Sequence, residues 1–112
     1  MGYAITGVGI AFREELSFKL QIIGALMAIS LGVFLKISRG DFIIVFLLIT
    51  LVLVIEVINT ALEELCDKFT LEHDPHIGKI KDLGAAASLL ASLGALAAGI
   101  LLFIPYILPN FQ

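Results

Sequence analysis

Residues 42–58 read FIIVFLLITLVLVIEVI, and this stretch decides the fold. Only Thr50 and Glu56 interrupt its run of aliphatic and aromatic side chains, and the apolar character continues to Leu65. A helix of about 20 mostly apolar residues is long enough to cross the hydrocarbon core of a bilayer. We therefore predict a transmembrane helix over about residues 42–65.

Two further apolar runs, residues 16–35 and 83–108, also approach spanning length. Hydrophobic residues make up 60% of the 112 residues and charged residues 15%, whereas about 25% of residues are charged in soluble domains. The sequence thus predicts an all-α membrane protein with three transmembrane helices, forming one domain over residues 1–112. No small-residue cleavage pattern ends the first run, so we expect no cleaved signal peptide. The net charge of −3 offers no basic surface for nucleic acid.

The positive charges predict how the chain crosses the membrane. Five of the seven Lys and Arg residues lie before or early in the first run, or between the second and third runs; the other two lie between the first and second. Lys and Arg are concentrated in cytoplasmic segments. We therefore expect the N-terminus and the second loop, residues 68–82, to be cytoplasmic.

Glu56 begins a polar stripe on the second helix. A carboxylate at mid-membrane costs about 2.5–3.5 kcal/mol even on lenient scales, so it usually has a function. Asn59, Glu63 and Asp67 follow at +3, +7 and +11, which places all four within about 80° of one helix face. Glu56 lies about one or two turns from the cytoplasmic end of its apolar run. The structural alternatives are a polar contact between helices for Glu56 and a solvated helix end for the outer residues, including Glu64.

The stripe has the chemistry of a phosphate-handling site. Mg²⁺ favours one or two carboxylates together with substrate phosphates, and Glu63, Asp67 and the upstream Glu15 could supply them. A buried carboxylate such as Glu56 is suited to accept a proton from a substrate hydroxyl.

Lys81 and Asp82 are expected to open the third helix. An Asp at a helix N-terminus is favourable to the helix dipole, and a cytoplasmic Lys follows the topology rule. Lys81 could equally neutralise a phosphate, and the residues alone leave both interpretations open.

The third run is rich in small residues at spacings of four, including Gly84, Ser88 and Ser92. Such spacing lets helix backbones approach closely in membranes. Three helices form a thin bundle that leaves the polar stripe partly uncovered, so we expect the protein to form a homo-oligomer. The sequence contains neither a G-x-x-x-x-G-K-[ST] loop nor a G-x-G-x-x-G kinase loop, which excludes the common soluble phosphate-handling classes.

The polar stripe belongs to a longer spaced motif. Residues 56–63 read EVINTALE, which resembles the signature E-x-x-N-[ST]-A-[IL]-E of the prokaryotic diacylglycerol kinase family, which includes undecaprenol kinases. The further residues that carry the resemblance are Asp67, Lys81 and Asp82 downstream, and Tyr3, Gly7, Glu15 and Phe18 upstream. The likeness extends from about Tyr3 to Leu102.

The resemblance implies a homotrimer in the bacterial cytoplasmic (inner) membrane. Each subunit would add a short amphipathic surface helix, about residues 1–15, to its three transmembrane helices. It implies ATP and Mg²⁺ as cofactors and active sites shared between neighbouring subunits near the cytoplasmic interface.

The resemblance also implies residue roles. Glu56 would be the general base and Asn59 its polar companion. Glu15 and Glu63 would hold the magnesium bound to ATP. The residues implied to contact or orient the nucleotide are Tyr3, Asp67, Lys81 and Asp82.

The expected reaction is transfer of the γ-phosphoryl of MgATP to the hydroxyl of a membrane lipid alcohol. Departures from both branches of the family, such as Ala85 and Ser17, leave diacylglycerol and undecaprenol level as substrates. Two rival functions are a small proton-coupled transporter with Glu56 as the proton site and a non-catalytic assembly subunit. A transporter would be expected to place its Glu near mid-membrane and would not need Asn59, Glu63, Asp67 and Lys81-Asp82.

Overall fold

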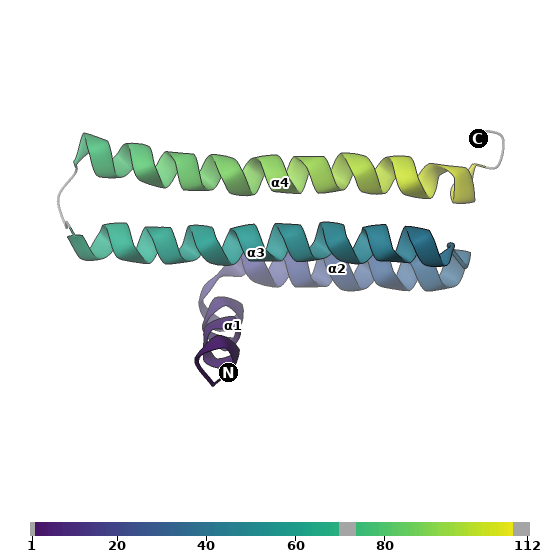
Figure 1. The fold of residues 1–112 in the computed structure, drawn as a ribbon, viewed down its shortest axis with the longest axis horizontal. Helices are drawn as coiled ribbons and strands as arrows, with labels where there is room; N and C mark the ends of the chain where they lie inside the picture. The colour runs from purple at the N-terminus through teal and green to yellow at the C-terminus, as the bar shows by residue number, and fades with distance from the viewer. Residues whose placement is uncertain (1, 70–73, 109–112) are drawn as a thin grey trace.

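A computed structural model describes residues 2–69 and 74–108. These residues form four helices, α1 (Gly2–Glu14), α2 (Leu16–Leu35), α3 (Arg39–Phe69) and α4 (Pro75–Ile107). The three long helices lie side by side, with α3 packed against both α2 and α4, while α1 projects away from them at the start of α2 (Figure 1). The chain reverses direction between α2 and α3 and again between α3 and α4. The end of α3 and the start of α4 therefore lie at the same end of the bundle, beyond the start of the shorter α2.

The three long helices are each long and apolar enough to cross a membrane. Many of their large apolar side chains are exposed on the single chain, such as Leu90 and Leu101, whose exposed fractions are 70% and 69%. Such surfaces are compatible with lipid or with neighbouring helices, and not with water. The prediction of an all-helical membrane protein with three long apolar helices is confirmed.

Helix α4 begins earlier than its apolar run, and a local cap explains why. The carboxylate of Asp74 accepts a hydrogen bond from the backbone N–H of His76 at 2.9 Å, and Pro75 occupies the first helical turn. Both features favour a helix start at this point. The prediction that Lys81 and Asp82 open this helix is therefore wrong, because they lie nearly two turns inside it.

Helix α3 also extends beyond its apolar run. It is continuous to Phe69, so 13 residues follow Glu56 within the helix. The distance of one or two turns was predicted from Glu56 to the end of the apolar run. The helix itself continues further, so Glu56 lies more than three turns from the end of α3. Figure 1 shows that α2 starts part of the way along α3, and α1 turns away there. Glu56 lies at this level, because it contacts Ser17 in the first turn of α2.

The opposite end of the bundle is held by a polar contact. The hydroxyl of Tyr106, near the end of α4, donates to Oδ2 of Asp41 at 2.5 Å and accepts from the backbone N–H of Ser38 at 3.0 Å. Asp41 and Ser38 belong to the turn and first residues that connect α2 to α3. This contact fixes α4 against the α2–α3 hairpin at the end away from Glu56.

Candidate active site

Glu56 is the centre of a contact between three helices. Its side chain is on α3, and its exposed fraction is only 6%. Ser17 of α2 donates its hydroxyl to Oε1 of Glu56, and Ser88 of α4 donates to Oε2, both at 2.5 Å. Each carboxylate oxygen therefore accepts a hydrogen bond from a different neighbouring helix. This arrangement satisfies a charge that would otherwise be costly to bury.

Asn59 and Glu63 continue the site along α3. The side-chain amide of Asn59 donates to Oε1 of Glu63 at 3.4 Å, a long hydrogen bond. Oδ1 of Asn59 is buried and has no hydrogen-bond partner among the described residues. Gly84 of α4 packs against this oxygen, so closely that a Cβ atom at residue 84 would clash with it. The glycine thus lets α4 approach the polar face of α3.

These side chains line a cavity of about 360 Å³. Its lining combines three carboxylates, from Glu15, Glu56 and Glu63, with polar side chains from α2, α3 and α4. Glu15 is the linking residue between α1 and α2, and its backbone begins α2. The structure therefore brings Glu15, Glu56, Asn59 and Glu63 together, although Glu15 is more than 40 residues from the others in sequence.

The electrostatics of the cavity are unfavourable to so many negative charges. Burial, followed by the neighbouring carboxylates of Glu63 and Glu56, raises the pKa of Glu15 above its ordinary value. Like charges that crowd together disfavour each other's ionised forms. A cation in this cavity would relieve the repulsion.

The donor set fits Mg²⁺ in one specific way. Glu15 and Glu63 supply two carboxylates, and among the described residues no three His, Cys, Asp or Glu side chains are arranged so that they could hold a metal ion by themselves. Mg²⁺ is commonly bound by one or two carboxylates that share the ion with substrate phosphates. The unpaired Oδ1 of Asn59 adds a buried oxygen acceptor beside them. The residues thus match a shared metal–phosphate site and do not form a closed protein cage.

Asp67 and Lys81 form an ion pair further towards the end of the bundle. Nζ of Lys81 donates to Oδ1 of Asp67 at 2.8 Å, which joins α3 to α4. The side chain of Lys81 is 40% exposed and that of Asp67 is 64% exposed. Asp82 is exposed as well. None of these three residues is among those that line the acidic cavity.

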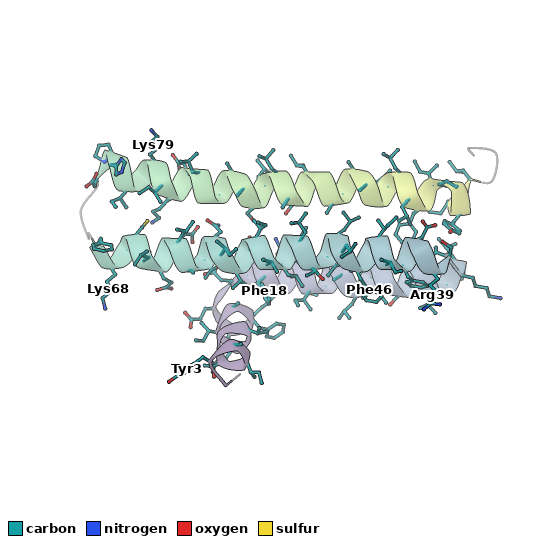
Figure 2. The ribbon with its side chains drawn as sticks, viewed as in Figure 1. Tyr3, Phe18, Arg39, Phe46, Lys68 and Lys79 are labelled. Atoms are coloured by element: carbon teal, nitrogen blue, oxygen red, sulfur yellow. The ribbon has the colours of Figure 1, made fainter. Side chains whose placement is uncertain are left out.

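Tyr3 does not reach the acidic cavity of its own chain. It lies near the outer end of α1, away from the long helices (Figure 2), and its exposed fraction is 94%. A role for Tyr3 in nucleotide binding would therefore require the site of a neighbouring subunit.

Sequence reasoning missed the two serines that contact Glu56. Ser88 was interpreted as one of the small residues that allow close helix packing, and Ser17 as a departure from a motif. The sequence contains a partial signal for Ser88. It is four residues after Gly84, so it lies on the same face of α4 as the glycine that packs against Asn59. Nothing in the local sequence indicates that Ser17 and Glu56, 39 residues apart, would meet.

The fold and the site together define a small helical membrane protein with a buried, hydrogen-bonded carboxylate beside an acidic cavity. A family model described as prokaryotic diacylglycerol kinase matches residues 2–103. The chain therefore belongs to the prokaryotic diacylglycerol kinase family. This membership makes it an enzyme of the lipid-kinase class.

Named relatives cover most of the chain. A diacylglycerol kinase of Pseudomonas aeruginosa is 32% identical over 90 residues, which are 80% of this chain and 73% of the relative. A diacylglycerol kinase of Haemophilus influenzae is 30% identical over 103 residues, 90% of this chain and 87% of the relative. An undecaprenol kinase of Bacillus subtilis is 29% identical over 103 residues, 92% of this chain and 84% of the relative.

Proposed function

We propose that the protein transfers the γ-phosphoryl group of MgATP to the hydroxyl of a membrane lipid alcohol, either diacylglycerol or undecaprenol. The lipid oxygen bonds to the γ-phosphorus, the bond from that phosphorus to the β,γ-bridging oxygen breaks, and ADP leaves. The hydroxyl proton passes to the carboxylate of Glu56, which acts as general base. The products are ADP and phosphatidic acid or undecaprenyl phosphate.

One observation carries this proposal. Glu56 is a buried carboxylate in a helix that is long and apolar enough to cross a membrane, and it opens onto a cavity with two further carboxylates. A base at the edge of the hydrocarbon region can meet a lipid hydroxyl, while the acidic residues beside it can hold a metal–nucleotide complex. Positioning and charge neutralisation supply most of the catalysis in phosphoryl transfer.

The roles of the other residues follow from their positions. Glu15 and Glu63 would hold Mg²⁺, which neutralises charge on the nucleotide phosphates when bound. Asn59 would orient Glu63 through its amide group. Asp67 near the end of α3, and Lys81 and Asp82 near the start of α4, would contact or orient the nucleotide.

An apolar cavity next to the acidic cavity supports a lipid as the acceptor. Gln21 and Ser92 line both the acidic cavity and an apolar cavity of about 400 Å³ that lies between α2, α3 and α4. A lipid alcohol could place its hydroxyl near Glu56 while its hydrocarbon chain stays in apolar surroundings. Figure 2 shows Lys68 and Lys79 at the end of the bundle where α4 begins and Arg39 at the other. This distribution supports a cytoplasmic position for the N-terminus and the second loop in the inner membrane.

The test is a phosphoryl-transfer assay. The purified protein is reconstituted in lipid with labelled ATP and Mg²⁺, and diacylglycerol and undecaprenol are supplied in turn. We expect labelled phospholipid with at least one of them, and the faster acceptor identifies the substrate. If neither alcohol is labelled by folded, reconstituted protein, the proposed function is wrong.

A further inference from the structure

We propose that Ser17 and Ser88 are positioning residues that hold the carboxylate of Glu56 in the orientation needed for proton transfer. This inference rests on the proposed function, since it assigns Glu56 the role of base. Neither serine needs to touch the substrate. Each would act through the carboxylate that it contacts.

Serines from two helices hold the carboxylate of Glu56 on a third helix, and we call these two hydrogen bonds, from Ser17 and Ser88, the clasp. Oε1 of Glu56 accepts from Ser17 on α2, and Oε2 accepts from Ser88 on α4. Because each oxygen accepts from a donor on a different helix, the carboxylate plane cannot rotate without losing a hydrogen bond. A general base must lie within hydrogen-bond reach of the proton that it accepts, so its orientation affects the rate directly.

The other side chains around Glu56 explain why the two hydroxyl donors are important. Glu15 and Glu63 line the same cavity as Glu56 and supply no hydrogen-bond donor when ionised. The residues of α4 that line the cavity are uncharged, and Lys19 of α2 lies over the ring of Phe12 on α1. Among the described residues, the two serine hydroxyls are the hydrogen-bond donors to Glu56. Hydrogen bonds to a carboxylate stabilise its ionised form, which is the form that can accept a proton.

The clasp leaves acceptor capacity for the substrate. Each carboxylate oxygen has two lone-pair positions, and each serine uses one. A lipid hydroxyl can therefore donate to a remaining position while both serines stay in place. This distinguishes the arrangement from a closed structural contact, in which the carboxylate would be fully occupied.

Ser17→Ala, Ser88→Ala and the double variant test the inference in the reconstituted assay. Each single variant is expected to lower kcat by about tenfold, the scale of one hydrogen bond to a charged group, with little change in the KM for MgATP. Ser88→Thr, which keeps the hydroxyl, should recover most of the activity. Ser30→Ala, on α2 but away from the acidic cavity, is the matched control and should behave like the wild-type protein.

The outcomes separate the inference from the proposed function. If the wild-type protein phosphorylates lipid and the double variant does so at the same rate, the clasp has no role and the kinase assignment stands. If the variants lose activity together with a lowered thermal midpoint and Ser88→Thr does not recover it, the serines serve packing only and the inference is wrong. If the wild-type protein itself has no lipid-kinase activity, the proposed function has failed first.

Discussion

At the scale of single residues, the most informative feature is a carboxylate in an apolar helix. Glu56 is buried, and two hydroxyls from neighbouring helices satisfy it. Replacing a carboxylate by the amide of Gln keeps the size of the side chain but removes its ability to accept a proton as a base. The two functions of the residue, packing and catalysis, can therefore be separated by one substitution.

Glu56→Gln is expected to keep the assembled protein and abolish turnover. General-base catalysis contributes about 10²–10⁴ in rate, so the loss should reach at least about 100-fold in kcat. The measurement is labelled lipid phosphate in the reconstituted assay, with the elution profile of the purified protein as the check on assembly. Glu64→Gln, an exposed neighbour on α3, is the control and should keep its activity. Full activity of Glu56→Gln would remove Glu56 as the base.

Glu15 offers a prediction about stability and pH. Its pKa is raised by burial and by the carboxylates of Glu63 and Glu56, so the ionised group destabilises the folded protein at neutral pH. Because the folded state then binds protons more readily than the unfolded state, this penalty disappears as the pH falls through the raised pKa. Without Mg²⁺, Glu15→Gln should therefore raise the thermal midpoint at neutral pH. The advantage should vanish below the ordinary carboxyl range.

Mg²⁺ should reverse this difference. If Glu15 holds the metal, added Mg²⁺ stabilises the wild-type protein more than Glu15→Gln, because a ligand stabilises the state that binds it. Thermal unfolding in detergent, with a chelator or with Mg²⁺, measures both effects. A lowered midpoint for Glu15→Gln at neutral pH without Mg²⁺ would contradict the electrostatic account.

At the scale of helices, the contact between α3 and α4 determines the shape of the site. Gly84 permits the close approach, because its missing side chain leaves space for Oδ1 of Asn59. The same register brings Ser88 to Glu56 and Lys81 to Asp67. These pairs lie along one face of α4, so a change in the spacing of the two helices would affect all of them together.

Gly84→Ala should disrupt this face. The added Cβ would clash with Oδ1 of Asn59 and lie 3.4 Å from Cδ1 of Leu62. Either the helices separate or Asn59 turns away from Glu63, at a cost of about 1–3 kcal/mol, typical of overpacking. We expect a lower thermal midpoint and a large loss of kcat. Gly94→Ala is the matched control on α4, because its Cβ meets no atom of the described residues within 4 Å. Equal activity of the two variants would show that the close approach is unnecessary.

At the scale of the whole molecule, one chain does not bring together every residue that the family motif implies. Glu15, Glu56, Asn59 and Glu63 meet in one cavity, whereas Tyr3 is 94% exposed and lies away from it. Large apolar side chains are also exposed along all three long helices. We propose that three copies associate and that each active site receives residues from two of them.

A mixing experiment tests the shared site. Tyr3→Ala and Glu56→Gln are each expected to be inactive or strongly impaired on their own. Unfolding and refolding them together should produce mixed assemblies, in which some sites combine an intact Tyr3 from one subunit with an intact Glu56 from another. Recovered activity above the sum of the separate variants supports sharing, and light scattering should give the mass of three chains. Activity no higher than that sum would mean that each site belongs to one subunit.

Local signals were sufficient to predict the three long apolar helices and the polar residues that α3 contributes to the site. The length of each apolar run set the number of spans, and the 3.6-residue period placed Glu56, Asn59 and Glu63 on one face, where the structure finds them beside the same cavity. The predicted start of α4 is wrong because it rests on the apolar pattern alone. The helix begins earlier, at the cap formed by Asp74 and Pro75.

Only the tertiary structure decided which helices meet at Glu56. Hydropathy and periodicity describe one helix at a time, because they depend on neighbours within a few residues. The partners of Glu56 come from residues 39 and 32 positions away, and their meeting depends on how closely and in which register α2 and α4 pack against α3. The sequence by itself therefore determined a membrane protein with a polar stripe. Only the packing of α2 and α4 against α3 placed the hydroxyls of Ser17 and Ser88 within hydrogen-bond distance of Glu56.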